Sequence, residues 1–308
     1  MLSKKDFLVI LNPRSLSLKV NKDRYDSLIR YLSSEKYTFD IISTKSSQDI
    51  KEYAKNGVDR YRAILPIGGD GTLNISLNGM MENRSAKDSS TKLIPMPFGT
   101  GRDTFLGYKP DFAEGDWSWL TPEIKTVRKT VGRYQDDTGK IGYFINGLSM
   151  GVSINVIHER EKWPKFIKFR PIVYTVVSFI ELFKYKAENI SIKIDNKESK
   201  NTDFVILMLQ KGQRIAGGMS FNRNPYDPKN REIELVVMKN IIFPKRIKYL
   251  LDISKGKLKE NPDFIIENGS RICVNSKNKR IILDSDGEIA VMSSEVLIEY
   301  VEGIEIPI

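Results

Sequence analysis

A glycine-rich loop at residues 68–74 carries the residue types that bind phosphate groups. It reads Gly-Gly-Asp-Gly-Thr-Leu-Asn and directly follows the apolar run at residues 62–67. Because glycine has no Cβ, the backbone N–H groups of such a loop can approach an anion closely. A helix that starts after Thr72 would direct its own N-terminal N–H groups to the same place. The loop predicts a nucleotide site, although a glycine loop by itself also occurs as a simple turn.

Two further polar loops follow strands that we expect in the same sheet. Short β-type runs alternate with helical patterns in the first third of the chain, which is typical of a parallel sheet with helices on both faces. The expected strands are residues 7–11, 37–42, 62–67 and 92–97, and the expected helices surround residues 25–32 and 50–54, the second ending at Gly57. Ligands of such folds bind at the carboxyl ends of the strands. The loops at residues 12–15, 68–74 and 98–103 should therefore share one edge.

The pattern changes near Thr126, where strand-like runs begin to follow one another with little helix. This predicts an antiparallel, β-sandwich-like domain. The expected strands are residues 128–135, 142–148, 190–194, 204–210, 232–238, 271–275, 280–283 and 295–301, with helices at 164–186 and 244–255 and hairpin turns at 136–139 and 195–196. We expect an α/β nucleotide-binding domain at residues 1–126, which residues 293–308 could complete, and a β-rich substrate domain at residues 127–292.

The composition limits the chemistry that is available. The chain has one histidine, His158, which lies in a polar run and is expected at the surface, and one cysteine, Cys273. A histidine-rich zinc site and an intrachain disulfide are therefore excluded, and a Ser-His-Asp mechanism would depend on His158 alone. The net charge is +10, with lysines scattered along the chain. The scattering of the lysines disfavours a nucleic-acid partner. The positive charge itself suits phosphorylated ligands or an anionic membrane surface.

The apolar runs are short. The N-terminal run at residues 7–11 is too short for a signal peptide, and the run at residues 172–183 is too short and too polar to cross a bilayer. We therefore expect a cytoplasmic protein.

Three motifs together resemble the diacylglycerol kinase catalytic family, which also contains sphingosine and ceramide kinases and the soluble bacterial lipid kinases. They are the loop at residues 68–74, the stretch Pro-Phe-Gly-Thr-Gly-Arg-Asp at 97–103, and Asp286-Gly287-Glu288. Residues 144–151 and 216–218 are similar to two further family motifs, so the resemblance spans nearly the whole chain. The compact length is most similar to the soluble bacterial branch. The resemblance implies ATP-dependent, magnesium-assisted phosphorylation of a diacylglycerol-like lipid, with peripheral contact to an anionic membrane.

The resemblance also implies roles for single residues. Asp70 and Asp103 would organise Mg²⁺, and Asp286 or Glu288 would take the proton from the attacking hydroxyl. ATP would be held by Asn12, Ser15, Thr44, Gly68, Gly69, Asp70, Gly71, Thr72, Asn74 and Thr100. Phosphoryl transfer needs positioning, charge neutralisation and a carboxylate near the nucleophile, but no histidine. Taken alone, residues 284–288 would predict only an acidic hairpin turn.

Three departures from the family pattern leave alternatives open. Leu16 stands where the family usually has glycine, Arg102 replaces an asparagine, and residues 229–232 replace an Asp-Gly pair linked to a structural metal. The alternatives are a sphingoid or ceramide kinase, an NAD kinase-like enzyme that shares the glycine loop, and a nucleotide- or lipid-binding protein without activity. The basic and apolar segment at 163–183 could dock on a membrane or could be a core helix. An edge of the β-rich domain could pair in a homodimer.

Overall fold

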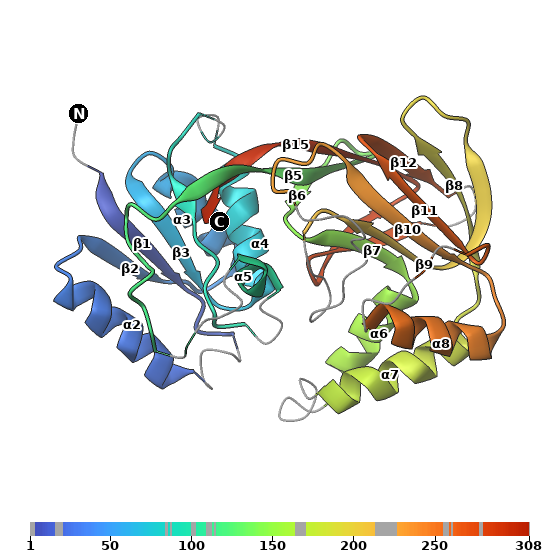
Figure 1. Cartoon of the computed structure of the whole chain (residues 1–308), viewed down its shortest axis with the longest axis horizontal. Coiled ribbons are helices and arrows are strands. Elements are labelled where there is room, and N and C mark those ends of the chain that lie inside the picture. Colours follow the sequence, from blue (N-terminus) through green and yellow to red (C-terminus); the bar gives the residue numbers. More distant parts are fainter. Residues whose placement is uncertain are drawn as a thin grey trace. The chain divides into compact units, whose positions relative to one another are not determined.

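The computed structural model describes residues 4–15, 21–83, 86, 88–99, 103–108, 113, 115–163, 171–212, 227–254, 259, 261–276 and 280–307. The chain divides into two compact units (Figure 1). Unit 1 comprises Met1–Val131, Asp227–Asn230 and Glu302–Ile308, and unit 2 comprises Gly132–Tyr226 and Arg231–Val301.

Unit 1 is built on a parallel sheet with the strand order β2-β1-β3-β4. Its elements are β1 (Lys5–Leu11), α2 (Lys22–Ser34), β2 (Phe39–Ser43), α3 (Ser47–Gly57), β3 (Tyr61–Ile67), α4 (Asp70–Met81), β4 (Lys92–Leu93) and α5 (Asp103–Tyr108). The apolar side chains of β1 and β3 share a core with Leu28 and Leu32 of α2. These two leucines lie one helical turn apart, so burial of one face stabilises the helix. The parallel α/β prediction is confirmed.

The fourth strand is shorter than predicted. We expected residues 92–97, whereas β4 contains only Lys92–Leu93. The next residue still pairs, because Ile94 N donates to Ile64 O at 3.0 Å. Pro95 and Pro97 then follow, and proline has no N–H to donate to a neighbouring strand. The chain therefore leaves the sheet before the loop that contains Gly99.

Unit 2 is mainly antiparallel. Its elements are β5 (Thr126–Asp136), β6 (Ile141–Phe144), β7 (Gly147–Gly151), α6 (Val152–Glu161), α7 (Pro171–Lys184), β8 (Glu188–Ile194), β9 (Lys200–Gln210), β10 (Ile233–Lys239), α8 (Phe243–Ser254), β11 (Phe264–Gly269), β12 (Arg271–Asn275), β13 (Ile281–Ser285), β14 (Glu288–Ser293) and β15 (Glu295–Pro307). β5 and β15 begin or end in unit 1. Every pair that the structure describes among β7 to β14 is antiparallel. The predicted antiparallel, β-rich second half is confirmed.

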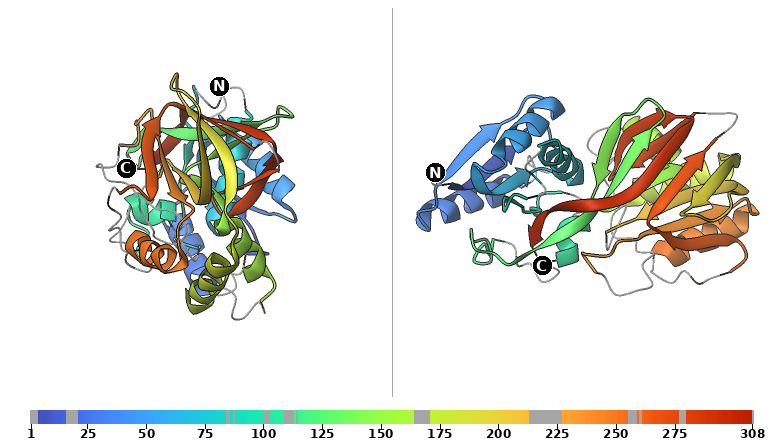
Figure 2. Two further views of the ribbon diagram at one scale, coloured as in Figure 1. Left: turned by 90° about the vertical axis from the view of Figure 1, so that its right-hand side faces the viewer. Right: turned by 90° about the horizontal axis from the view of Figure 1, so that it is seen from above.

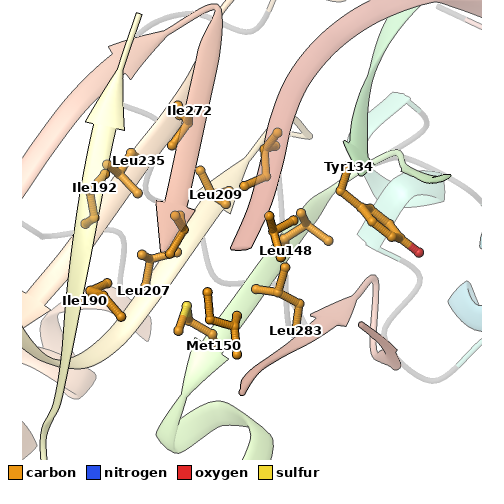
Figure 3. Packing of buried hydrophobic residues seen from close by; sticks show 14 of the residues in the cluster. Tyr134, Leu148, Met150, Ile190, Ile192, Leu207, Leu209, Leu235, Ile272 and Leu283 are labelled. Carbon is orange, nitrogen blue, oxygen red and sulfur yellow. The ribbon is translucent and has the colours of Figure 1, made fainter. Parts of the chain in front are cut away.

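Two apolar layers hold unit 2 together. The inner layer contains buried side chains from β5 to β10, β12, β13 and β15, among them Leu148, Leu207, Leu209, Leu235 and Leu283 (Figure 3). The outer layer lies where α6, α7 and α8 cover one face of the sheet (Figures 1 and 2). A sheet that buries both faces needs apolar residues on consecutive positions. The run Phe-Val-Ile-Leu-Met-Leu at 204–209 of β9 provides them, and all six are buried.

Several expectations for unit 2 need correction. The single strand expected at residues 142–148 is two strands, β6 and β7, interrupted at Ile145 and Asn146. α6, β11 and β14 were not predicted, and His158 lies exposed on α6, at the surface as expected. The expected helix at 164–186 is described as α7 from Pro171, and its first seven residues lie outside the described residues.

The hairpin turns at 136–139 and 195–196 occur where expected, between β5 and β6 and between β8 and β9. Among the helices of the described residues, none combines the length and the apolar character needed to cross a membrane.

Candidate active site

The carboxyl ends of β1, β2 and β3 lie side by side in unit 1. Leu11, the last residue of β1, is in register with the last residues of β2 and β3. Asn12, Thr44 and Gly68, which follow these three ends, therefore stand next to one another. Thr44 N donates to Leu11 O at 2.9 Å, and Asn12 N donates to Ile67 O at 3.0 Å. The sheet thus brings three of the predicted ATP-binding positions to one edge.

The Gly68 loop is folded tightly against the first turn of α4. Asn12 Nδ2 donates to Thr72 Oγ1 at 3.0 Å, which ties the loop after β1 to the loop after β3. A Cβ at Gly68 would lie 2.2 Å from the same Thr72 oxygen, so this position requires glycine. Among the described residues, an added Cβ at Gly69 would have one neighbour within 4 Å, Gly99 Cα at 3.9 Å, which is an ordinary contact. The fold therefore does not itself explain the second glycine.

The loop that contains Gly99 packs directly on the Gly68 loop. A Cβ at Gly99 would lie 3.0 Å from Gly69 Cα and 3.4 Å from Asp70 N. Two backbones that approach this closely leave no space for a side chain between them. The two glycine loops therefore form one continuous backbone surface at the sheet edge.

The Gly99 loop is anchored by its neighbours in unit 1. Phe98 is fully buried and stacks on Trp117, with 6.1 Å between the ring centroids. Arg24 of α2 donates through Nη1 to Pro97 O at 2.5 Å. Sequence reasoning missed Arg24, because no motif links α2 to this loop. The sequence could have indicated Arg24 only through its place on a helix next to the sheet edge where the site was predicted.

Three other predicted ATP-binding residues make contacts within the protein. Thr44 is buried, and its hydroxyl donates to Leu11 O at 2.9 Å. Asn74 is buried in α4, where its Oδ1 accepts from Asn78 Nδ2 at 3.1 Å. Ser15 N donates to Asn12 O at 3.1 Å, which closes the turn after β1. Gly71 lies in the first turn of α4. Thr100, Leu16 and Arg102 lie outside the described residues.

The two predicted magnesium-organising acids each begin a helix after a glycine loop. Asp70 is the first residue of α4 and is partly exposed, whereas Asp103 is the first residue of α5 and is buried. In the described part of the chain, no three His, Cys, Asp or Glu side chains gather as a metal site. Mg²⁺ is commonly held by one or two carboxylates together with water and substrate phosphates. Two carboxylates that each follow a glycine loop are therefore of a type that could hold this ion.

The third motif forms a two-residue hairpin turn in unit 2. Asp286 and Gly287 have φ values of +49° and +96° and connect β13 to β14. Positive φ at both central residues matches the right-handed twist of the flanking strands. The Asp286 carboxylate accepts three consecutive backbone N–H groups, from Ile145 at 2.8 Å, Asn146 at 3.0 Å and Gly147 at 2.9 Å. In return, Asp286 N donates to Gly147 O at 3.0 Å.

The interruption between β6 and β7 is what makes these N–H groups available. Asn146 O also accepts from Lys211 N at 2.7 Å and from Gly212 N at 2.8 Å, so the loop after β9 is attached to the same junction. A Cβ at Gly212 would lie 2.4 Å from Asn146 Oδ1. Sequence reasoning missed this junction, although Asn146-Gly147 is a dipeptide that often marks a turn.

The surroundings of the hairpin are polar and partly buried. Burial, together with the charges of Asp286 and Asp136, raises the pKa of Tyr134 to about 12. Glu288 is the first residue of β14 and pairs with Ser285, and the placement of its side chain lies outside the described part. Residues 216–218 also lie outside it. In the stretch that replaces the Asp-Gly pair, Asn230 O accepts from Thr130 Oγ1 at 2.6 Å.

Comparison with known proteins agrees with the motifs. Residues 6–114 match the family model of the diacylglycerol kinase catalytic domain, and this range contains both glycine loops. Over these residues the chain is similar to the diacylglycerol kinase catalytic family. A diacylglycerol kinase of Staphylococcus aureus (strain bovine RF122 / ET3-1) is 25% identical over 91% of this chain and 85% of its own length. The putative lipid kinase YtlR of Bacillus subtilis (strain 168) is 21% identical over 75% of each chain.

Solved structures of family members share the fold. A putative diacylglycerol kinase from Bacillus anthracis str. Sterne superposes with a TM-score of 0.73 at 19% identity and covers 99% of this chain and 98% of its own. A second diacylglycerol kinase structure from the same organism gives a TM-score of 0.68 at 18% identity, over 99% of this chain and 97% of that one. At these identities the likeness concerns the fold alone.

Proposed function

We propose that this protein transfers the γ-phosphoryl group of ATP to the hydroxyl of a diacylglycerol-like lipid. The observation that carries the proposal is the contact between the two glycine loops of the family, with Gly99 packed against Gly69 at the carboxyl edge of a parallel sheet. A backbone surface of this kind offers N–H groups to phosphate oxygens. The third family motif, at Asp286, adds a carboxylate-bearing hairpin.

In this proposal the residues of unit 1 bind and orient the nucleotide. The backbone of residues 68–72 contacts the phosphates, supported by Asn12 and Thr72 through their mutual hydrogen bond. Ser15, Thr44 and Asn74 shape the same sheet edge, and Thr100 would add its hydroxyl, as the resemblance implies. Asp70 and Asp103 would hold Mg²⁺. When bound, this ion would neutralise charge on the phosphate oxygens.

The acceptor hydroxyl is activated by the acidic hairpin in unit 2. A carboxylate of the pair Asp286 and Glu288 takes the hydroxyl proton as the lipid oxygen bonds to the γ-phosphorus. The bond from that phosphorus to the β–γ bridging oxygen breaks, and ADP leaves. General base assistance of this kind typically contributes about 10²- to 10⁴-fold to the rate.

The lipid substrate requires contact with a membrane, and α7 offers an apolar face for it. Val176, Ile180 and Phe183 are spaced i, i+4, i+7 on this helix and are exposed, Phe183 by 71%. Val173, Val177 and Leu182 are buried, so α7 is apolar on more than its packed face. A surface helix normally has polar residues opposite its buried stripe.

Positive charge beside this stripe favours an anionic membrane as its partner. Lys184 and Lys186 are exposed immediately after Phe183, at the end of α7. Phe183 contacts Phe243 of α8 edge to face, with 5.1 Å between ring centroids, and the neighbouring Ile242 is 67% exposed. Apolar side chains beside lysines bind anionic bilayers through both burial and charge.

Vesicle sedimentation tests the membrane contact. Phe183→Ser should weaken binding to phosphatidylglycerol vesicles and leave the already weak binding to phosphatidylcholine vesicles unchanged. Tyr53→Ser, which alters an exposed aromatic on α3 of unit 1, is the matched control and should bind like the wild type. Equal binding of the Phe183 variant and the wild type would remove α7 from the proposal.

The activity is tested with labelled ATP, Mg²⁺ and a panel of acceptors. The panel contains diacylglycerol, monoacylglycerol, sphingosine, ceramide, phosphatidylglycerol and NAD. We expect label on diacylglycerol or a closely similar glycerolipid. Label on sphingosine or ceramide alone would change the substrate class, label on NAD alone would overturn the lipid assignment, and no label on any acceptor would favour a binding protein.

A further inference from the structure

Two tryptophans of unit 1 contact the chain on both sides of the Gly99 loop. Trp117 stacks on Phe98, directly before the loop, with 6.1 Å between the ring centroids. Trp119 packs on Phe105 of α5, after the loop, with 5.8 Å between the centroids. The two rings of this tryptophan pair also contact each other, at 6.3 Å. Aromatic rings at such distances attract one another. A continuous row of four rings therefore joins the chain before the loop to α5.

The tryptophan pair is itself held by hydrogen bonds. Trp119 Nε1 donates to Asp116 O at 2.9 Å, and Trp117 Nε1 donates to Ser27 Oγ of α2 at 2.8 Å. The hydroxyl of Tyr31, also on α2, donates to the carbonyl oxygen of the residue after Trp119, at 3.2 Å. Ser27 and Tyr31 are four residues apart and so lie on one face of the helix. The tryptophan pair is thus attached to a helix that packs on the central strands of unit 1.

The helix α5 is too short to hold its own position. It has six residues, whereas isolated helices shorter than about 12–15 residues are marginal in water. Its direction therefore depends on packing, and Phe105 is its buried aromatic side chain. Phe105 stands two residues after Asp103, which begins the helix and is a predicted magnesium-organising acid. The packing of Trp119 on Phe105 therefore helps to fix the place of Asp103.

We infer that the tryptophan pair consists of positioning residues for the binding of Mg-ATP. Trp117 acts through its stacked partner on the backbone at Gly99, which forms part of the proposed phosphate-binding surface. Trp119 acts through α5 on Asp103, which would hold the metal ion. The inference rests on the proposed function, but it concerns nucleotide binding and not the transfer step. A row of rings that holds both sides of the loop in place before ATP binds lowers the cost of ordering on binding.

Substitution of Trp119 separates this role from a general loss of stability. Trp119→Leu removes the ring contacts with Phe105 and Trp117, so the affinity for Mg-ATP should fall about 3- to 10-fold. Because Trp119 acts on a metal-binding acid, the affinity for ATP in the presence of EDTA should stay as in the wild type. Trp119→Phe keeps an aromatic ring and should restore most of the affinity for Mg-ATP. Isothermal titration calorimetry with and without Mg²⁺ measures these affinities.

A ring pair in unit 2 provides the matched control. Tyr249 of α8 and Phe264 of β11 pack edge to face, with 4.9 Å between the ring centroids. Phe264→Leu loses a comparable contact, so it should lower the Tm and bind Mg-ATP with wild-type affinity. The inference would be overturned if Trp119→Leu lost affinity equally for Mg-ATP and for metal-free ATP, or if it lost none.

Fluorine NMR of the wild-type protein covers the case in which the tryptophan variants do not fold. The chain has three tryptophans, so labelling with 5-fluorotryptophan gives three signals, and Trp163→Phe identifies the one that comes from unit 2. Saturating Mg-ATP should shift the signals of Trp117 and Trp119 and leave the Trp163 signal in place. Signals of the tryptophan pair that do not respond to saturating Mg-ATP would overturn the inference.

The inference and the proposed function fail separately. If the wild-type protein binds Mg-ATP and Trp119→Leu shows the expected loss, but no acceptor is phosphorylated, the proposed transfer alone is defeated. If the wild-type protein phosphorylates a lipid and Trp119→Leu binds Mg-ATP as tightly as the wild type, the positioning role alone is defeated.

Discussion

Gly68 and Gly69 offer a way to separate folding from nucleotide binding, because the fold requires a glycine only at the first of them. In Gly68→Ala the new Cβ would lie 2.2 Å from Thr72 Oγ1 and 2.7 Å from Thr72 Cβ. Thr72 would have to leave its rotamer and its hydrogen bond with Asn12. In Gly69→Ala, within the described part of the chain, the Cβ would meet only Gly99 Cα at 3.9 Å. The Gly69 backbone is extended, with φ −88° and ψ −173°, which any residue can adopt.

The expected magnitudes differ accordingly. For Gly68→Ala, overpacking costs about 1–3 kcal/mol and the lost hydrogen bond about 1 kcal/mol, so the free energy of unfolding should fall by about 2–4 kcal/mol. For Gly69→Ala, the poorer helix N-cap is offset by a smaller entropy of the unfolded chain, so the net change stays within about 1 kcal/mol. That is a Tm shift of less than about 4 °C.

Gly69→Ala should weaken the binding of Mg-ATP strongly, although it changes the stability of the fold little. A methyl group on the phosphate side of the loop would remove about two amide–phosphate hydrogen bonds of about 1.5 kcal/mol each. The affinity for Mg-ATP should then fall about 10²-fold. Isothermal titration calorimetry with Mg-ATP, run well below the Tm of each variant, measures this loss.

A glycine elsewhere in α4 provides the control. A Cβ at Gly79 would lie 2.2 Å from Lys51 O, so Gly79→Ala should lower the Tm while the folded protein binds Mg-ATP with wild-type affinity. If Gly69→Ala folds normally and binds Mg-ATP as tightly as the wild type, the Gly68 loop does not contact phosphate. The assignment of the nucleotide site would then be wrong.

Three further perturbations test the structure around the site. Thr72→Val should cost about 1 kcal/mol in chemical denaturation, because Asn12 Nδ2 loses its acceptor. Arg246→Met should lower unfolding free energy by about 3–5 kcal/mol, because the guanidinium is buried and donates to carbonyl groups at the end of α7; an unchanged Tm would contradict this. Hydrogen bonds from the Ser294 side chain and backbone lower the pKa of Asp137 to about 2. Its stabilisation is therefore present above the unfolded pKa near 4 and is lost toward pH 2, so Asp137→Asn should unfold with a flatter acid dependence.

The part of the site that could be predicted from sequence is the part that depends on strand order. Once the apolar runs at 7–11 and 62–67 are identified as neighbouring parallel strands, Asn12 and Gly68 must follow ends that lie together. The pairing of Leu11 with Ile67 fulfils this. By contrast, the contact between Gly69 and Gly99 depends on where the chain leaves the sheet. Pro95 and Pro97 end the strand there. A prediction based on hydrophobic periodicity alone extends the strand through them.

The junction between β6 and β7 could not be predicted from an apolar pattern. The run from Tyr143 to Leu148 continues the period of a strand, and a strand was therefore expected across it. The chain instead directs the N–H groups of Ile145, Asn146 and Gly147 to a side-chain acceptor, because a buried backbone N–H without an acceptor would be costly. That acceptor is Asp286, about 140 residues away, and a local reading of sequence has no access to a partner at such a distance.

The hydrogen bonds between Asp286 and residues 145–147 limit what the substitution Asp286→Asn can show about the role of the acidic motif. The sequence allows residues 284–288 to be either an acidic turn or the site of a catalytic carboxylate. In the structure the Asp286 carboxylate attaches the turn to the backbone of residues 145–147. Asp286→Asn would place an amide N–H₂ opposite the Ile145 N–H, so it removes a hydrogen bond as well as a charge. Loss of activity in that variant alone would fit a base and an anchor equally well. The kcat of Glu288→Gln, compared with that of Asp286→Asn, is the measurement that separates the two roles.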